Sequence, residues 1–212
     1  MSPRPGIYLI TPEKINLDLF VKQLEEALST NCITYVQLRL KNCTDEVLLE
    51  SASALLRVTK NFEIPLIIND RPDIVKQVGG DGVHLGQNDS SVKKARNLLG
   101  KNSIIGVTCH DSISLACEAV NSGADYIAFG AFFESISKKI EYFADISILD
   151  WWKKISKIPC VAIGGININN FQNLYLHGAT DIAVISSVWK HPKGPAFAIN
   201  QYSKKISLLN KF

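Results

Sequence analysis

Three features that would restrict this chain to a specialised class are missing from its sequence. Its five cysteines include no Cys-x-x-Cys pair and no regular spacing, so they indicate reduced core residues rather than a disulfide framework. No apolar run approaches the roughly 20 residues that a bilayer-spanning helix needs. The formal net charge is only +3, too small and too dispersed to indicate a nucleic-acid or membrane surface.

What remains is the composition of one ordinary globular domain. The chain has 212 residues, of which 46% are hydrophobic and 20% charged. Its first residues, Met-Ser-Pro-Arg-Pro-Gly, lack the apolar segment of a signal peptide. We therefore expect a cytoplasmic protein in which residues 1–212 form a single catalytic domain. We expect no nucleic-acid or membrane partner, and the sequence leaves open whether the chain forms a homodimer.

Short β-branched runs alternate with amphipathic stretches eight times along the chain. Eight uninterrupted repeats predict an α/β fold, a single (β/α)8 TIM barrel, rather than an open doubly wound sheet. The expected strands are residues 7–10, 35–38, 66–68, 82–85, 104–107, 126–129, 161–163 and 182–185. The expected helices are residues 17–28, 45–60, 72–78, 91–99, 112–121, 146–155, 169–176 and 195–208.

Glycines stand between several of these helices and the strands that follow, as in 79–83, 123–127 and 178–182. Glycine at such a position suits a left-handed helix stop before a buried strand. In a (β/α)8 barrel the chemistry lies in the loops at the carboxyl ends of the strands. The residue types at those loops therefore decide what function the sequence predicts.

The second expected strand ends in Gln37, Arg39 and Lys41, with leucines between them. Alternate residues of a strand face the same side, so these three side chains should project together while Leu38 and Leu40 face the helices. Two cations and an amide at a barrel mouth suit a phosphate or a diphosphate. The alternative is a strand end with basic groups reaching into solvent.

Asp70 and Asp89 follow the third and fourth expected strands. Two carboxylates on adjacent strand exits, near cations, suit a Mg²⁺ ion that keeps several waters and takes phosphate oxygens as ligands. The alternative is that each aspartate caps the helix after it. His84 is more readily explained as a packed strand residue than as a ligand, because no second histidine or cysteine accompanies it.

Thr108, Cys109 and His110 follow the fifth expected strand. The threonine hydroxyl could donate to a phosphate oxygen or cap the next helix. Cys109 and His110 suggest a nucleophile and its base, but neighbouring residues on a strand point to opposite faces and no orienting acid is evident. We therefore do not expect a cysteine nucleophile.

The last three strand exits carry small and hydroxyl-bearing residues. Ser135, Ser137 and Lys138 suggest an anion contact in the longest loop, although a solvated polar loop explains them equally well. Gly164-Gly165 and Ser186-Ser187 would let backbone N–H groups approach a phosphate. Together the loops predict a charged site suited to a diphosphate and an uncharged site suited to a monophosphate. That pair favours the joining of two phosphorylated molecules, though an isomerase with one phosphate also fits.

The same segments occur in the order found in thiamine-phosphate synthases, which the chain resembles from Tyr8 to about Trp189. The matching motifs are Gln37-Leu38-Arg39-Leu40-Lys41, Asn69-Asp70-Arg71, Asp81 to Asp89, Gly106-Val107-Thr108-Cys109-His110 and Ile163-Gly164-Gly165-Ile166. The resemblance implies a (β/α)8 enzyme that joins a pyrimidine methylene to a thiazole nitrogen and releases diphosphate. Its cofactor would be Mg²⁺.

The resemblance also implies a role for individual residues. Asp70 and Asp89 would hold Mg²⁺ against the diphosphate, and Arg39, Lys41 and Lys138 would be the catalytic cations. The pyrimidine diphosphate would be bound by Gln37, Leu38, Arg39, Leu40, Lys41, Asn69, Thr108 and Lys138. The thiazole phosphate would be bound by Ser135, Ile136, Ser137, Gly165, Ile185 and Ser186.

Two departures from the family pattern and two rival functions accompany these assignments. Thr108 stands where the family usually has serine, and the segment 134–143 differs from the usual loop. A thiazole tautomerase on the same barrel would lack the metal aspartates and the full Gln-x-Arg-x-Lys motif. A non-catalytic barrel that binds thiamine precursors would be supported only by the altered loop.

Overall fold

The strands of the chain close into a parallel barrel, which confirms the predicted fold. The computed structural model describes residues 5–30, 32–134 and 142–209. Each strand pairs in parallel with the next, and β1 pairs with β8 to close the barrel. The strands are β1 Gly6–Ile10, β2 Ile33–Leu38, β3 Leu66–Asn69, β4 Gly82–Leu85, β5 Ile104–Thr108, β6 Tyr126–Gly130, β7 Cys160–Ile163 and β8 Asp181–Val184.

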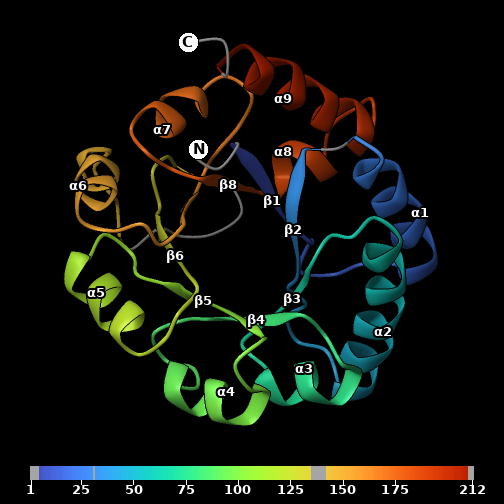
Figure 1. The fold of residues 1–212 in the computed structure, drawn as a ribbon. Coiled ribbons are helices and arrows are strands. Elements are labelled where there is room, and N and C mark those ends of the chain that lie inside the picture. Colours follow the sequence, from blue (N-terminus) through green and yellow to red (C-terminus); the bar gives the residue numbers. More distant parts are fainter. Residues whose placement is uncertain (1–4, 31, 135–141, 210–212) are drawn as a thin grey trace.

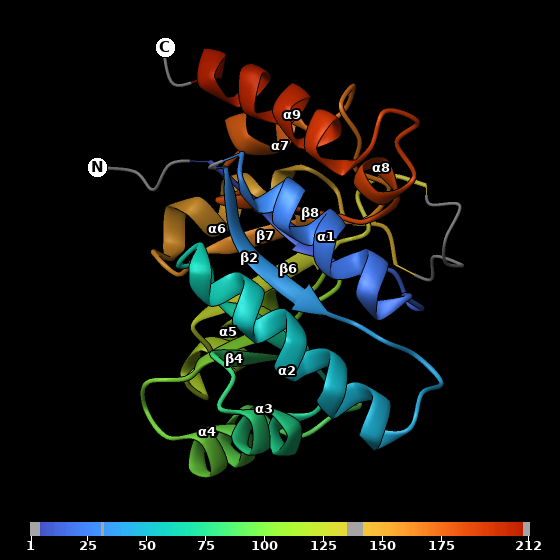
Figure 2. The same ribbon diagram turned by 90° about the vertical axis from the view of Figure 1, so that its right-hand side faces the viewer.

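The helices form a ring around the barrel (Figure 1). Figure 2 shows the molecule from the side, with the arrowhead of β2 at the end where all strands of a parallel barrel finish. The helices are α1 Leu17–Leu28, α2 Asp45–Asn61, α3 Pro72–Val78, α4 Val92–Leu99, α5 Ile113–Asn121, α6 Ser147–Ile155, α7 Gln172–Leu176, α8 Ser186–Trp189 and α9 Pro195–Leu209. Within the described segments, none of them combines the length and the hydropathy that crossing a membrane requires.

The apolar core has two layers separated by the strands. Ile7 and Leu9 pack outward against the helices, whereas Tyr8 and Ile10 of the same strand pack into the barrel interior. Both faces of each strand are therefore buried, which explains why the strand sequences are nearly continuous apolar runs. The interior layer contains two tyrosines, Tyr8 and Tyr126, whose hydroxyls need polar partners.

The glycine-containing turns before β4 and β6 are each followed by an aspartate at the amino end of the barrel. Gly79 and Gly123 adopt φ angles of 67° and 97°, in the left-handed region that glycine tolerates. The aspartates that follow each accept a backbone N–H from the preceding strand. Asp81 accepts from Leu66 at 2.8 Å, and Asp125 accepts from Ile105 at 2.7 Å.

Two elements after β7 differ from the prediction. The helix expected over residues 169–176 begins at Gln172, because Asn167 and Asn170 form side-chain turns with the local backbone that compete with a helix. The strand expected to end at 185 ends at Val184, and the short helix α8 follows at once. Figure 1 draws α8 inside the ring that the other helices form.

Candidate active site

The exit of β2 carries two cations that both have carboxylate partners. The Arg39 guanidinium donates to Glu13 at 2.7 Å, and the Lys41 ammonium donates to Asp70 at 3.0 Å. The backbone of the exit is fixed as well, since the Arg39 N–H donates to the Thr11 hydroxyl at 2.9 Å. Both cations are thus held at the carboxyl end of the barrel by groups from neighbouring strand exits.

Asp70 and Asp89 meet at the exits of β3 and β4. Asp70 has a φ of 64°, an uncommon value for a residue with a side chain, and its N–H donates to the His84 carbonyl at 2.8 Å. The Asp89 carboxylate accepts the Gly86 N–H at 2.7 Å. Partial burial raises the pKa of Asp89, and hydrogen-bond contact with the Asp70 carboxyl raises it further. Two crowded carboxyls beside one lysine form a site suited to an additional cation.

Neither aspartate caps a helix, which removes the alternative explanation for this pair. Ser91 caps α4 by accepting from the Lys94 N–H, and α3 begins after Arg71 without a side-chain cap. The same holds for Thr108, because Ser112 caps α5 by accepting from the Leu115 N–H. The three polar residues are therefore free of the structural role that sequence alone allowed.

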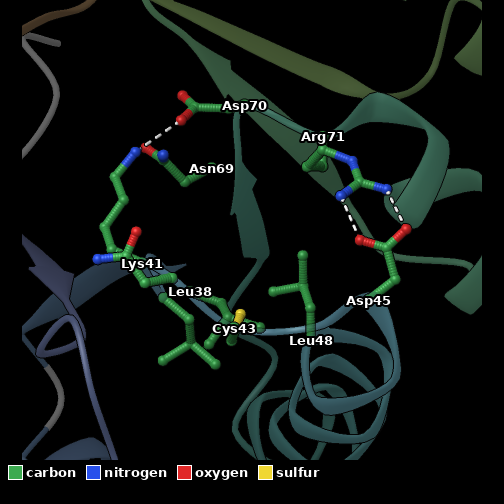
Figure 3. A pocket seen from close by; sticks show the side chains of 10 residues that line it. Leu38, Lys41, Cys43, Asp45, Leu48, Asn69, Asp70 and Arg71 are labelled. Atoms are coloured by element: carbon green, nitrogen blue, oxygen red, sulfur yellow. Dashed lines mark hydrogen bonds and ion pairs between the residues drawn. The ribbon is translucent and has the colours of Figure 1, made fainter.

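A pocket of about 170 Å³ lies between the exits of β2 and β3 (Figure 3). The Lys41–Asp70 ion pair lines one side, and on the other Arg71 forms a two-bond ion pair with Asp45 at 2.6 and 3.0 Å. Arg71 also contacts Asp73 at 2.6 Å. Hydrogen bonds to Arg71 lower the pKa of Asp45 and of Asp73. Arg71 therefore links α2 to α3 through these ion pairs, whereas the residue directly before it, Asp70, pairs with Lys41.

A continuous chain of polar side chains crosses the interior of the barrel. The Gln37 amide donates to the Tyr8 hydroxyl at 2.9 Å, and the Tyr8 and Tyr126 hydroxyls lie 2.7 Å apart. His84 then bridges Tyr126 to Thr108, with 2.8 Å from Nδ1 to the Tyr126 oxygen and 2.8 Å from Nε2 to the Thr108 hydroxyl. Gln37 of β2 and Thr108 of β5, which lie three strands apart in the barrel, are therefore connected through it.

Burial sets the ionisation of this interior. It lowers the pKa of His84 to about 4, so the imidazole is neutral near pH 7, and it raises the pKa of both Tyr8 and Tyr126. Burial also raises the pKa of the Cys109 thiol to about 12. Cys109 packs in the outer layer and its thiol faces the Val107 carbonyl, so it is not an activated nucleophile.

The leucines between the cations face away from the mouth. Leu38 is fully buried in the outer layer, and Leu40 packs against that layer. Gln37 points the other way, into the interior, where it contacts Tyr8. Any contact of the two leucines with a substrate at the barrel mouth would therefore use their backbone.

Left-handed glycines shape the described residues at the exit of β7, and backbone hydrogen bonds join them to the start of the exit of β6. Gly164 and Gly165 have φ angles of 102° and 62°, and the N–H of Phe133 donates to the Gly164 carbonyl at 3.1 Å. Ile185 packs against the interior layer, and Ser186 begins α8. Ser135, Ile136, Ser137 and Lys138 lie outside the described residues.

Three residues of this region were not singled out from the sequence. Tyr8 and Tyr126 lie within apolar strand runs, and the only available signal was a hydroxyl at an inward-facing position. Glu13 lies in the loop after β1, and its pairing with Arg39 depends on two strand exits that are distant in sequence. Among the described residues, no three or more acidic, histidine or cysteine side chains gather closely enough to hold a metal ion by themselves. A metal ion at this end of the barrel would therefore need substrate oxygens as further ligands.

Comparison with known proteins identifies similar chains over almost the whole length. A family model described as "Thiamine monophosphate synthase" matches residues 7–188. A thiamine-phosphate synthase of Rhodospirillum centenum is 43% identical over 198 residues, which cover 93% of this chain and 96% of that protein. One of Pelagibacter ubique is 42% identical over 187 residues, which cover 88% and 90%.

A solved structure agrees with these sequence matches. The thiamine phosphate pyrophosphorylase of Pyrococcus furiosus superimposes with a TM-score of 0.83 at 30% identity, covering 97% of both chains. A 3-hexulose-6-phosphate synthase superimposes with a TM-score of 0.67 at 15% identity, which shows a shared fold alone.

Proposed function

The chain belongs to the thiamine monophosphate synthase family, and from this premise we propose that it condenses hydroxymethylpyrimidine diphosphate with hydroxyethylthiazole phosphate, plain or carboxylated. The products are thiamine monophosphate and diphosphate. Membership makes the chain an enzyme, a transferase of thiamine biosynthesis that acts on small phosphorylated substrates. The identity of the thiazole, the metal, the mechanism and the residue roles form our proposal.

The observation that carries the proposal is the cluster of Lys41, Asp70 and Asp89 at three adjacent strand exits. An ion pair as exposed as Lys41–Asp70 contributes little to stability, with a typical value below about 1 kcal/mol. The cluster is better explained by a ligand that is anionic and arrives with a cation. A diphosphate bound with Mg²⁺ has that composition.

Asp70 and Asp89 are the residues that would hold Mg²⁺. Their carboxyl groups contact each other. Partial burial raises the pKa of Asp89, the neighbouring Asp70 carboxyl raises it further, and a bound cation would favour the charged form of both. Two carboxylates suffice for an ion that keeps waters and takes substrate oxygens as its other ligands. When bound, the ion neutralises negative charge on the diphosphate as it leaves.

Arg39, Lys41 and Lys138 are the cations that stabilise the leaving diphosphate in this proposal. Arg39 now donates to Glu13 and Lys41 to Asp70, so both would exchange a carboxylate for a phosphate oxygen. Such exchange costs little, because one charge-assisted hydrogen bond replaces another. Lys138 lies outside the described residues and keeps its role from the family motif alone.

The remaining contacts to the pyrimidine diphosphate come from Gln37, Asn69 and Thr108, and from the backbone of Leu38 and Leu40. Asn69 ends β3 directly before Asp70, and both line the pocket in Figure 3. The second phosphate, on the thiazole, is assigned to Ser135, Ile136, Ser137, Gly165, Ile185 and Ser186. Small residues there allow backbone N–H groups to approach an anion.

No side chain needs to act as a nucleophile in this reaction. The aminopyrimidine stabilises a methylene cation, so the C–O bond to diphosphate breaks before the thiazole nitrogen attacks. The tasks of the protein are to stabilise charge on the leaving group and to hold the nitrogen beside the cation. The high pKa and buried packing of Cys109 are consistent with this pathway.

The proposal is tested by mixing both substrates with the purified protein, with and without Mg²⁺. We expect thiamine monophosphate and diphosphate to form in equal amounts, and only when Mg²⁺ is present. Thiazole isomerisation without condensation would replace our proposal with a tautomerase. Binding of both substrates without any product would replace it with a non-catalytic binding protein.

A further inference from the structure

The polar chain in the barrel interior has properties that the proposed reaction does not yet use. It runs from Gln37 through Tyr8, Tyr126 and His84 to Thr108, with donor–acceptor distances between 2.7 and 2.9 Å. The exposed fraction is 2% for Gln37 and Tyr8, 1% for Tyr126 and 8% for His84. Water therefore does not supply alternative partners for the central hydroxyls.

Each hydroxyl of the chain and the neutral imidazole have one proton to give, so the direction of one hydrogen bond determines the next. The Gln37 amide donates to the Tyr8 oxygen, which leaves the Tyr8 proton for Tyr126. The Tyr126 proton then goes to His84 Nδ1, and a neutral imidazole that accepts at Nδ1 carries its proton on Nε2. Nε2–H consequently donates to the Thr108 oxygen.

We infer that His84 is a positioning residue, held as the Nε2–H tautomer by Tyr126, so that the Thr108 hydroxyl keeps its own proton for a substrate phosphate oxygen. Thr108 thereby becomes an obligate donor toward the barrel mouth. This inference rests on the proposed function in one respect, namely that an oxygen of the diphosphate lies against Thr108.

The opposite direction would have the opposite effect on the substrate. If Thr108 donated to His84 Nε2, its oxygen would present only lone pairs to the mouth, and these repel a phosphate. The reversed chain would also require Gln37 to turn its carbonyl oxygen toward Tyr8. With the Gln37 amide nitrogen toward Tyr8, every buried side-chain nitrogen and oxygen atom of the described residues has a hydrogen-bond partner.

The tautomer can be measured without any substrate. The protein labelled with ¹⁵N-histidine gives long-range ring ¹H–¹⁵N correlations that separate the two neutral tautomers. At pH 7.5 we expect His84 as Nε2–H, and Tyr126→Phe should shift it toward a mixture by removing the donor to Nδ1. His177, which pairs with Asp150 at the surface, should be unchanged in the same spectrum. An Nδ1–H majority in the unsubstituted protein would refute the inference, whatever the enzyme does.

A double-mutant cycle tests the consequence for the substrate. Thr108→Val should lower kcat/KM for the pyrimidine diphosphate by about 10- to 100-fold, the range expected for one hydrogen bond to a charged group. Tyr126→Phe should lower kcat/KM by less, about 3- to 10-fold. With a mixture of His84 tautomers, the Thr108 hydroxyl still donates to the substrate phosphate for part of the time. In the Thr108→Val background the Tyr126→Phe change should have no further effect, because the group on which it acts is gone.

Conservative variants separate positioning from a general loss of packing. Thr108→Ser keeps the hydroxyl and should lose much less activity than Thr108→Val. His84→Gln, whose amide can donate near the place of Nε2, should likewise retain more activity than His84→Leu. Effects of Tyr126→Phe that are the same in both Thr108 backgrounds would overturn the proposed role of His84. If the unsubstituted protein made no thiamine monophosphate, the proposed function would fail, while the tautomer measurement would still decide the inference.

Discussion

The two ends of the barrel use the same residue type in opposite ways. At the amino end, Asp81 and Asp125 each accept a backbone N–H from the preceding strand. At the carboxyl end, Asp70 and Asp89 instead face each other beside Lys41. The first pair completes backbone hydrogen bonds of the strands, whereas the second adds charge repulsion even though Asp89 also accepts the Gly86 N–H. The end of the strand at which an aspartate lies therefore separates a structural role from the functional role that we propose.

The contrast extends to the arginines near each end. Arg96 at the amino end donates to Asp125 and to the carbonyls of Gly100 and Gly123, which the protein itself supplies permanently. Arg39 at the carboxyl end holds Glu13, an exposed carboxylate that a phosphate could replace. Fixed partners stabilise a fold, and exchangeable partners allow a site to bind its ligand without a large desolvation cost.

The largest expected effect is on turnover, from removing a carboxylate at the carboxyl end. Asp70→Asn or Asp89→Asn should lower kcat by about 10²- to 10³-fold, the range for losing one preorganised electrostatic stabiliser, and should weaken the response to Mg²⁺. Steady-state assays over a Mg²⁺ series measure both. Asp73→Asn, which removes a nearby carboxylate that contacts Arg71 instead, is the control and should stay close to the unsubstituted rate. Full activity in both site variants would show that the metal assignment is wrong.

Lys41→Ala should have the next largest effect and should mainly impair handling of the diphosphate. Losing a charge-assisted hydrogen bond to the substrate is worth about 1.5–3 kcal/mol, or about 10- to 100-fold in kcat/KM for the pyrimidine substrate. The KM for the thiazole phosphate should change little, because that substrate is assigned to the exits of β6–β8. An equal loss for both substrates would mean that the two anion sites are not separate.

The order of the strands and the facing of their residues were predictable from the sequence. Alternation in Gln37-Leu38-Arg39-Leu40-Lys41 gave the correct directions for Gln37 and Leu38, because side chains alternate along any strand. The contact between Asp70 and Asp89 followed from adjacent parallel strands. These features depend on the local periodicity of the strands and on the eightfold alternation of strands and helices, and both can be read from the sequence.

The pairing of groups across the barrel was not predictable in the same way. Nothing local distinguishes Tyr8 in its apolar run from a tyrosine that packs against a helix, so its contact with Tyr126, 118 positions later, could not be read. His84 was predicted as a packed strand residue, and it is one, but its two hydrogen-bond partners come from β5 and β6. The short helix α8 was missed because four residues are too few for a helical period to show.

Asp125→Ala should affect stability rather than catalysis, which reverses the pattern of the site carboxylates. The change leaves the buried Ile105 N–H and part of Arg96 without their acceptor, so we expect a loss of about 1–3 kcal/mol in the free energy of unfolding. Urea denaturation measures it. Asp125→Asn keeps an acceptor oxygen and should lose less. Activity per folded molecule should be unchanged, and a drop of 100-fold would remove the distinction between the two ends.

The smallest expected effect is a gain in stability from a change that harms catalysis. The folded-state pKa of Asp89 is raised above its usual value near 3.8, so its stabilising contribution is present below that value and is lost as pH rises through the folded-state pKa. At pH 7 the charged carboxyl therefore opposes folding, and Asp89→Asn should increase the free energy of unfolding there, by less than about 1 kcal/mol because the group is largely exposed. Near pH 3 the gain should vanish.

Asp73 should show the opposite change in stability. Hydrogen bonds to Arg71 lower the pKa of Asp73, so Asp73→Asn should destabilise the protein at pH 7 and lose that effect as pH falls below the usual pKa. Urea curves for both variants at the two pH values test the comparison, since variants that respond alike would mean that the crowding of Asp70 and Asp89 carries no energetic cost for the free enzyme.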